Sequence, residues 1–264
     1  MPSDEPTTGT TNPRILWLVL AHVVVGLMGA FVAYPCRSPT LRTGVFLGLV
    51  FSQTSLLGIW GGLGSGPWWK RVVGVIVGVG YLGTLLSFSI YGPVSANYFV
   101  VSLSTLLIVG VLLVFRFFRV QVCTAINAPA AACRMQFTVR QLLVLTFVVA
   151  CLMSLGKRLA PHLMDVGQPF YMTLIGLVFA TIGTLSVWLL GARHPILPSL
   201  ILIVVAAGVG FCLAQFLPGP PGDMASFWMT ITSVEALSLV PSLLVVRSCG
   251  YRLVRLPSRR QEER

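Results

Sequence analysis

One acidic residue, Glu235, falls inside a long apolar run and is the strongest candidate for chemistry in the sequence. A charged side chain at the centre of a bilayer costs at least about 2.5–3.5 kcal/mol. We therefore expect Glu235 to face the interior of a helix bundle, to be protonated, or to have a partner. Pro241 follows on the same run, where it would free a backbone carbonyl near Leu237 and kink the helix. A buried acid beside a broken helix is typical of sites that bind ions or protons.

Two further polar residues, His22 and Gln53, lie near the middle of the first and second apolar runs. His22 paired with Glu235 would form a proton relay. The alternative is ordinary hydrogen bonding between helices, worth about 0.6–2 kcal/mol per bond, with Glu235 bonded to Ser233, Ser238 or a residue on another helix. The sequence favours this alternative, because it shows no proximity between these residues. The candidate buried polar site comprises Glu235, His22 and Gln53.

Motifs for other chemistry are missing from the sequence. It contains no H-E-x-x-H, no G-x-S-x-G and no G-x-x-x-x-G-K-[ST]. Its cysteines lack metal-ligand spacing such as C-x-x-C, so we interpret them as free thiols. We expect no catalytic, cofactor-binding or metal-binding residues, and no cofactor. The cysteines lie at positions 36, 123, 133, 151, 212 and 249.

The composition is that of a chain whose surface faces lipid. Of its 264 residues, 56% are hydrophobic and only 9% are charged, whereas a soluble domain is about 25% charged. A helix needs about 20 mostly apolar residues to cross a bilayer. We predict an all-α polytopic membrane helix bundle of about eight transmembrane helices in a lipid bilayer. The predicted spans are 15–34, 44–63, 72–91, 98–118, 140–156, 170–190, 197–217 and 225–246.

The basic residues predict the orientation of the chain. With eight spans and a cytoplasmic N-terminus, fourteen of the 18 Lys and Arg residues lie on the cytoplasmic side and four lie outside. If the short span 140–156 did not cross, the split would be nine and nine, so the positive-inside rule favours eight spans. Both termini are then cytoplasmic, which suits a bacterial cytoplasmic membrane. The net charge of +11 is spread over the gaps between spans, so we expect no nucleic-acid partner.

Four pairs of segments indicate an internal repeat. GLVFSQTSLLGIW (48–60) matches GLVFATIGTLSVW (176–188) at an offset of 128. The other pairs are 18–28 with 143–153, 78–81 with 208–211, and 112–116 with 243–247, at offsets of 125, 130 and 131. Colinear matches favour a tandem 4+4 parallel duplication, and the alternative is chance similarity between apolar helices.

The predicted organisation has five parts. They are a disordered cytoplasmic N-terminus (1–14), a first four-helix membrane repeat (15–118), a cytoplasmic linker (119–139), a second four-helix membrane repeat (140–246) and a basic cytoplasmic tail (247–264).

The segment RMQFTVRQLLVLTFVVACLMSLGK (134–157) resembles one that is common in planctomycete-type bacteria, where it often reads FSLRTLL (here 137–143) before an apolar helix. GLVFSQTSLLGIWGGLG (48–64) is similar to a phrase in uncharacterised multi-pass membrane proteins of that group. Thr138 and Gln141 depart from the usual Ser and Thr. The resemblance implies a membrane segment and a lineage. It implies no catalytic residue.

These observations favour a non-enzymatic integral membrane protein with a structural or accessory role, as a homo-oligomer or with a partner in a membrane complex. The first alternative is a small proton- or ion-coupled transporter that uses Glu235 in the bundle interior. The second is an intramembrane enzyme, which would need another polar catalytic group near a candidate residue in a pocket.

Overall fold

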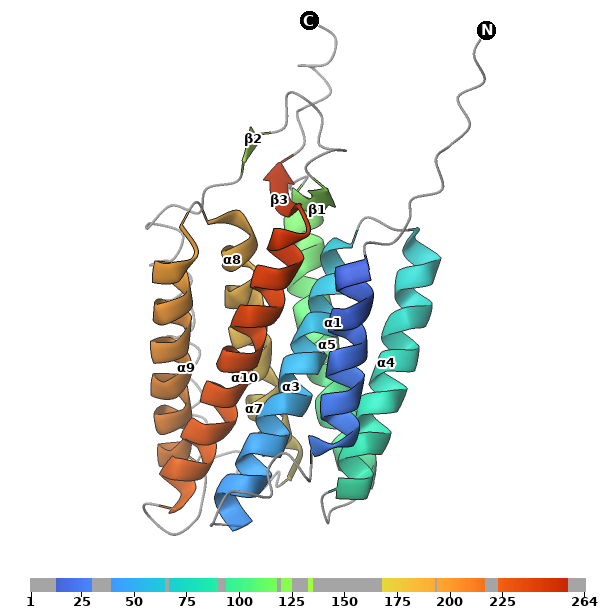
Figure 1. Cartoon of the computed structure of the whole chain (residues 1–264). Helices are drawn as coiled ribbons and strands as arrows, with labels where there is room; N and C mark the ends of the chain where they lie inside the picture. Colours follow the sequence, from blue (N-terminus) through green and yellow to red (C-terminus); the bar gives the residue numbers. More distant parts are fainter. Residues whose placement is uncertain are drawn as a thin grey trace, which may run out of the picture.

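The structure is a computed structural model that describes residues 13–29, 39–64, 67–89, 94–117, 120–124, 133–134, 168–192, 194–216 and 223–255. Its long helices lie side by side in a bundle, and short strands lie at one end of that bundle (Figure 1). The elements are α1 (Pro13–Leu27), α3 (Pro39–Leu63), α4 (Trp68–Ser89), α5 (Val94–Phe117), β1 (Val120–Thr124), β2 (Cys133–Arg134), α7 (Gln168–Ser186), α8 (Trp188–Gly191), α9 (Ile196–Phe216), α10 (Asp223–Ser248) and β3 (Tyr251–Arg255).

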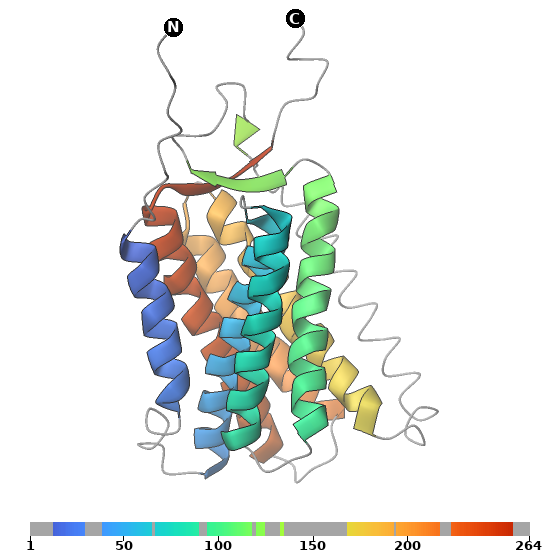
Figure 2. The ribbon, with the colours of Figure 1, turned by 90° about the vertical axis from the view of Figure 1, so that its right-hand side faces the viewer.

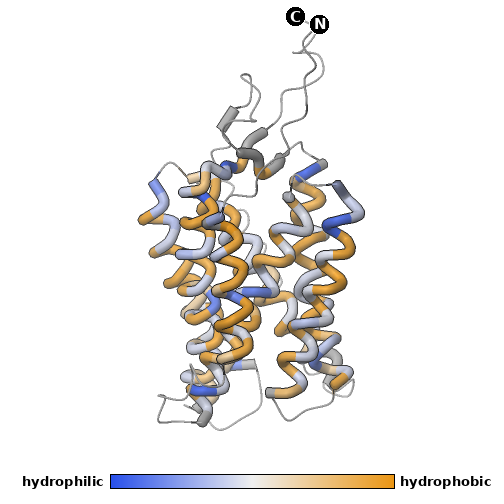
Figure 3. The backbone as a smooth tube through the Cα atoms, turned by 45° about the vertical axis from the view of Figure 1, so that its right-hand side comes forward, coloured by the Kyte–Doolittle hydropathy of each residue, from blue (hydrophilic) through white to orange (hydrophobic). Residues whose placement is uncertain are grey.

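Among the described residues, 6 helices are long and apolar enough to cross a membrane. Apolar residues run along most of their length (Figure 3). The protein is therefore an integral, multi-pass membrane protein built as a helical bundle, as the composition predicts. The six segments are Thr40–Leu63, Trp68–Phe88, Val94–Arg116, Tyr171–Gly191, Ile196–Gln215 and Met224–Ser248.

Two predicted spans are described only in part or not at all. The first, 15–34, begins in α1, but that helix ends at Leu27, and residues 30–38 lie outside the described residues. The apolar part of α1, Ile15–Leu27, is shorter than the other six segments. The short fifth span, 140–156, lies wholly outside the described residues.

The helices run in two opposite directions. α3, α5, α7 and α10 point one way, whereas α1, α4 and α9 point the other way (Figures 1 and 2). α1 therefore begins, and α10 ends, at the same end of the bundle, which is also where the strands lie. α5 ends at this strand-bearing end, whereas α7 begins at the opposite end, so the chain between them has to join the two ends of the bundle.

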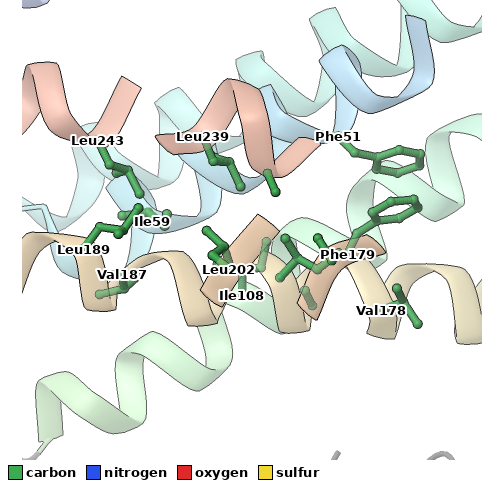
Figure 4. Close-up of a cluster of buried hydrophobic side chains, with 14 of the residues drawn as sticks. Phe51, Ile59, Ile108, Val178, Phe179, Val187, Leu189, Leu202, Leu239 and Leu243 are labelled. Carbon is green, nitrogen blue, oxygen red and sulfur yellow. The ribbon is translucent and has the colours of Figure 1, made fainter. Parts of the chain in front are cut away.

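Four helices, α3, α5, α7 and α10, form the centre of the bundle. α3 packs against both α5 and α10, and α5 packs against α7. In the most apolar stretch of each helix, 61% of α3 is buried, compared with 22% of the peripheral α4. Phe51 of α3 stacks on Phe179 of α7, with ring centroids 3.7 Å apart and planes 10° from parallel. Figure 4 shows these two rings facing each other within the apolar core.

A three-stranded antiparallel sheet caps one end of the bundle, in the order β1-β3-β2. Its strands come from the predicted linker and the predicted tail, for which the sequence analysis predicted no secondary structure. In β1 and β3, Val122 lies opposite Leu253 at the centre of the paired register. Gly250, with φ of 88°, occupies the left-handed conformation that lets the chain turn from α10 into β3.

Arginine side chains donate hydrogen bonds to carbonyl groups at the C-terminal ends of helices near this sheet. Arg116 Nη1 donates to Gly64 O at 3.1 Å, and Arg247 Nη1 donates to Leu189 O at 3.0 Å. Arg71 Nη1 donates to Gly61 O at 2.9 Å. These carbonyls belong to the ends of α3 and α8, where helices lack internal donors, so the cations satisfy groups that are otherwise unpaired.

Candidate functional site

Glu235 is completely buried between α10 and α3. Its exposed fraction is 0%, and Ser55 Oγ donates to its Oε1 at 2.8 Å. Its other carboxyl oxygen, Oε2, has no hydrogen-bond partner among the described residues. The structure therefore places Glu235 in the bundle interior with a hydroxyl partner, which are two of the three outcomes that the sequence left open.

Glycines bring α3 and α10 close together, so that the short serine side chains of α3 can reach α10. A Cβ atom added to Gly48 would lie 2.6 Å from Ile231 O and 2.7 Å from Val234 Cβ. Gly44, one turn earlier, lies against Thr230 and the Phe227 carbonyl. Small residues four apart allow such close approach of helix backbones. The contact places α3 hydroxyls within reach of α10.

A second serine pair extends the polar contact along the same two helices. Ser52 Oγ donates to Ser238 Oγ at 3.0 Å. Ser52 and Ser55 are three residues apart on α3, and Glu235 and Ser238 are three apart on α10, so each pair shares one helix face. Ser242, one turn beyond Ser238, donates to Ser238 O at 2.7 Å. These residues form a polar ladder on a helix contact that is otherwise apolar.

His22 joins the ladder from α1. Its Nε2 lies 2.8 Å from Ser242 Oγ. Gln53 Nε2 donates to His22 O at 2.9 Å, and Tyr81 OH donates to Val23 O at 3.2 Å. α1 is thus attached to α3, α4 and α10 through hydrogen bonds as well as through apolar contacts.

Gly26 makes the attachment of α1 possible. A Cβ atom at this position would lie 2.7 Å from Tyr81 OH and 3.0 Å from Gln53 Nε2. Any side chain here would push both donors away from the α1 backbone. The absence of a side chain at Gly26 therefore lets Gln53 and Tyr81 bond to the carbonyls of the preceding turn.

An open groove of about 540 Å³ lies between α1, α3 and α10. Its polar lining residues are His22, Ser238 and Ser242, and Pro241 lies beside them. The rest of the lining is apolar. Glu235 is not among the lining residues, although its neighbours Val234 and Leu237 are. The groove therefore reaches the outer part of the polar ladder and stops short of the carboxyl group.

The structure brings the three predicted site residues into one region but not into one cluster. His22 and Gln53 are in direct contact, whereas Glu235 bonds to Ser55 instead of His22 or Gln53. The sequence analysis did not single out Ser52, Ser55 or Ser242. Their signal was the helical spacing of hydroxyls opposite Glu235, which is weak because serines in membrane helices commonly bond to their own backbone.

The chemistry available to this arrangement is limited by access. The Ser55 hydroxyl touches the Glu235 carboxyl, but both residues have an exposed fraction of 0% and neither lines the groove. An intramembrane enzyme needs a substrate pocket beside its paired groups. Among the described residues, no group of three or more His, Cys, Asp and Glu side chains could hold a metal ion.

Comparisons with other proteins do not add to this description of the site. No protein-family model, curated protein or solved structure matches the chain.

Proposed function

We propose that the protein is a non-enzymatic structural or accessory component of a membrane, in which the polar ladder holds α1, α3 and α10 together. The sealed position of Glu235 carries this proposal, because its carboxyl group contacts Ser55 and does not line the groove. Interhelical hydrogen bonds in membranes each contribute about 0.6–2 kcal/mol. Several of them along one contact fix the register of the three helices.

The proposal includes eight spans with both termini in the cytoplasm of a bacterial cell. Two observations support it. α5 ends and α7 begins at opposite ends of the bundle (Figure 2), as a crossing by 140–156 requires. All Lys and Arg of the described residues except Arg42 lie at or near the strand-bearing end, where α1 begins and α10 ends (Figure 1). The positive-inside rule makes this the cytoplasmic end.

A parallel duplication of four spans is also part of the proposal, and three contacts support it. Phe51 and Phe179 are related by the offset of 128, and they stack on each other. Val122 and Leu253 are related by the offset of 131, and they pair at the centre of the β1–β3 register. Equivalent residues touch each other where a two-fold axis passes between two copies. Both contacts fit one such axis running along the bundle.

The third contact is a matched pair of arginines. Arg116 and Arg247 are also related by the offset of 131. Each donates to a carbonyl near the end of the second described helix of its own half, Gly64 O in one case and Leu189 O in the other. These contacts support the duplication at the level of the helices, although the two acceptors are not aligned residues, since Leu189 aligns with Gly61.

A second candidate function is a small proton- or ion-coupled transporter. The observation that favours it is Glu235 Oε2, which is buried without a hydrogen-bond partner among the described residues. Buried polar atoms nearly always have a partner, and an exception calls for an explanation such as a bound ion or a missing water molecule. Ser238, one turn from Glu235 on α10, lines the groove and would offer a polar group on a route to it.

One experiment separates the two functions. The protein and its Glu235→Gln variant are reconstituted into vesicles that contain a pH-sensitive dye, and proton flux is measured under an imposed gradient. Asp223→Asn, at the start of α10, is the matched control for a carboxyl-to-amide change. The structural role predicts no flux above empty vesicles for any of the three proteins. Flux in the wild type and in Asp223→Asn that disappears in Glu235→Gln would overturn it.

A further inference from the structure

The proposed duplication allows equivalent helix contacts in the two halves of the chain to be compared, and the following inference rests in part on that duplication. In the repeat alignment, the contact of α3 with α10 corresponds to the contact of α7 with α5. Gly48 packs against Val234 in the first, and the aligned Gly176 packs against the aligned Leu103 in the second. The same glycine-mediated packing therefore occurs twice in one chain.

Most of these polar residues occur at only one of the two contacts. Glu235 aligns with Ser104, Ser238 with Leu107, Ser242 with Val111, and His22 with Phe147. α5 and α7 pack closely without the histidine and without two of the hydroxyls. The glycine-mediated packing of two helices therefore occurs once with those groups and once without them. Their presence on one side only, where they line a groove, points to a bound molecule.

The lining of the groove defines the class of that molecule. The volume of about 540 Å³ falls within the range of about 300–1,000 Å³ that is typical of ligand sites, which are mostly apolar with a few placed polar groups. None of the described residues that line this groove is Lys, Arg, Asp or Glu. A charged head group would therefore lack a counter-charge there. The groove suits an apolar chain with an uncharged polar end.

Hydrogen bonding at His22 identifies the polar end. The Ser242 hydroxyl donates to Ser238 O, and its oxygen can still accept a hydrogen bond. We therefore assign the His22 proton to Nε2, which then donates to Ser242 Oγ. In a neutral imidazole, Nδ1 is then an acceptor. Nδ1 forms no hydrogen bond with any other residue in the described part of the chain. A hydroxyl group is an uncharged donor that would complete this site.

We infer that the groove between α1, α3 and α10 binds a long-chain alcohol drawn from the bilayer, with its hydroxyl on His22 Nδ1 and its chain along α10. Leu237, which lines the groove, is 53% exposed, so the groove is open to the surrounding lipid. The ligand would enter sideways without crossing water. Binding does not require Glu235 to change its contacts.

The test is photolabelling of the full chain in lipid nanodiscs with a hexadecanol that carries a diazirine on its chain. We expect labelled peptides from α1 and α10, and competition by excess hexadecanol. The methyl ether of hexadecanol lacks the proton and should compete poorly. Since a hydrogen bond in a membrane contributes about 0.6–1.7 kcal/mol, His22→Phe should weaken labelling about three- to eighteenfold.

Three further variants keep the test decisive. Ala21→Phe fills the groove without touching any hydrogen bond of the ladder and should abolish labelling even if His22→Phe misfolds. His22→Gln retains an acceptor and should bind better than His22→Phe. Thr84→Val removes a hydroxyl from α4 that does not line the groove, and should label like the wild type.

Two results would overturn the inference. One is equal competition by the ether. The other is labelling that spreads over α4 and α9 and is unchanged by His22→Phe and Ala21→Phe. Neither result bears on proton flux, so this inference and the proposed function can fail separately.

Discussion

Phe51 on α3 and Phe179 on α7 stack face to face at the centre of the bundle, with ring centroids 3.7 Å apart and planes inclined by 10°. Both rings are buried, with exposed fractions of 4% and 0%. The two residues occupy matching positions in GLVFSQTSLLGIW and GLVFATIGTLSVW. The stack joins the two halves of the chain through the same residue of each half.

Truncating either ring should destabilise the bundle. A buried Phe→Ala change costs about 3–5 kcal/mol in soluble cores. We expect a value at or below the lower end of that range, because lipid tails solvate an exposed phenyl ring almost as well as the core does. The free energies of unfolding of Phe51→Ala, Phe179→Ala and the double variant form a cycle, whose coupling should be about 0.5–1.5 kcal/mol.

Phe88→Ala is the matched control for this cycle, because Phe88 is 88% exposed on α4. Its free energy of unfolding should differ little from that of the wild type. A coupling energy of zero between Phe51 and Phe179 would show that the stack does not hold the two halves together.

Removing the Ser55 hydroxyl should lower the free energy of unfolding by more than the loss of one small polar group suggests. Ser55→Ala leaves Glu235 Oε1 buried without its donor, and an unsatisfied buried group costs about 1–3 kcal/mol. Adding Glu235→Met removes the remaining polar group, so the double variant should recover part of the loss. Unfolding in a graded detergent mixture measures both effects.

The control for Ser55→Ala is Ser104→Ala. Ser104 is equally buried, but its hydroxyl donates only to Val100 O of its own helix. Its loss should change stability by less than about 0.5 kcal/mol, because no partner is left without a donor. Equal losses for Ser55→Ala and Ser104→Ala would contradict the role assigned to the α3–α10 bond.

Six spans could be predicted from the sequence because hydropathy and length suffice to identify membrane helices. Their bounds were less certain. The span predicted at 72–91 begins at Trp68 in the structure. Arg71 lies in the first turn of α4, where it is 8% exposed and bonds to Gly61 O, so the helix can include this cation. A hydropathy reading places such a cation outside the span. The strands were missed because VQVCT and YRLVR are short and pair only through distant chain segments.

The candidate site was predicted in part for a similar reason. A buried acid in an apolar run is visible in sequence, and Glu235 is indeed inside the bundle. Its partner Ser55 is 180 residues away in the chain, and one hydroxyl among many gives no pairing signal. The contact of His22 with Ser242 likewise depends on where α1 packs. Helix packing, which composition does not encode, decides such pairs.

The helix-end contacts of Arg116 and Arg247 should contribute similar amounts to the free energy of unfolding. Hydrogen bonds that involve a charged group contribute about 1.5–3 kcal/mol. We expect Arg116→Gln and Arg247→Gln to lower the free energy of unfolding by comparable amounts, because each removes a donor from a helix-end carbonyl. Arg42→Gln, on an exposed side chain, is the control. A loss for one variant only would weaken the equivalence of the two halves.

Cysteine accessibility should test the proposed fifth crossing. In a variant without native cysteines, a cysteine at Asp165 should react with a membrane-impermeant maleimide added outside intact cells. A cysteine at Lys70, which lies at the start of α4, should react only after the membrane is opened. The positive-inside rule predicts this difference. Labelling of position 165 only from the cytoplasmic side would remove the crossing at 140–156 and the eight-span topology with it.

A disulfide cross-link should test the pairing of β1 with β3. Val122 lies directly opposite Leu253 in antiparallel register, where Cα atoms are about 4.5–5.5 Å apart, within the range of a disulfide. In the same cysteine-free background, Val122→Cys with Leu253→Cys should oxidise readily, as measured by loss of thiol labelling. Gln121→Cys with Leu253→Cys is the control, because neighbouring residues of a strand point to opposite faces. If the control pair oxidised as fast, the register would be wrong, and the two-fold relation between β1 and β3 would lose its support.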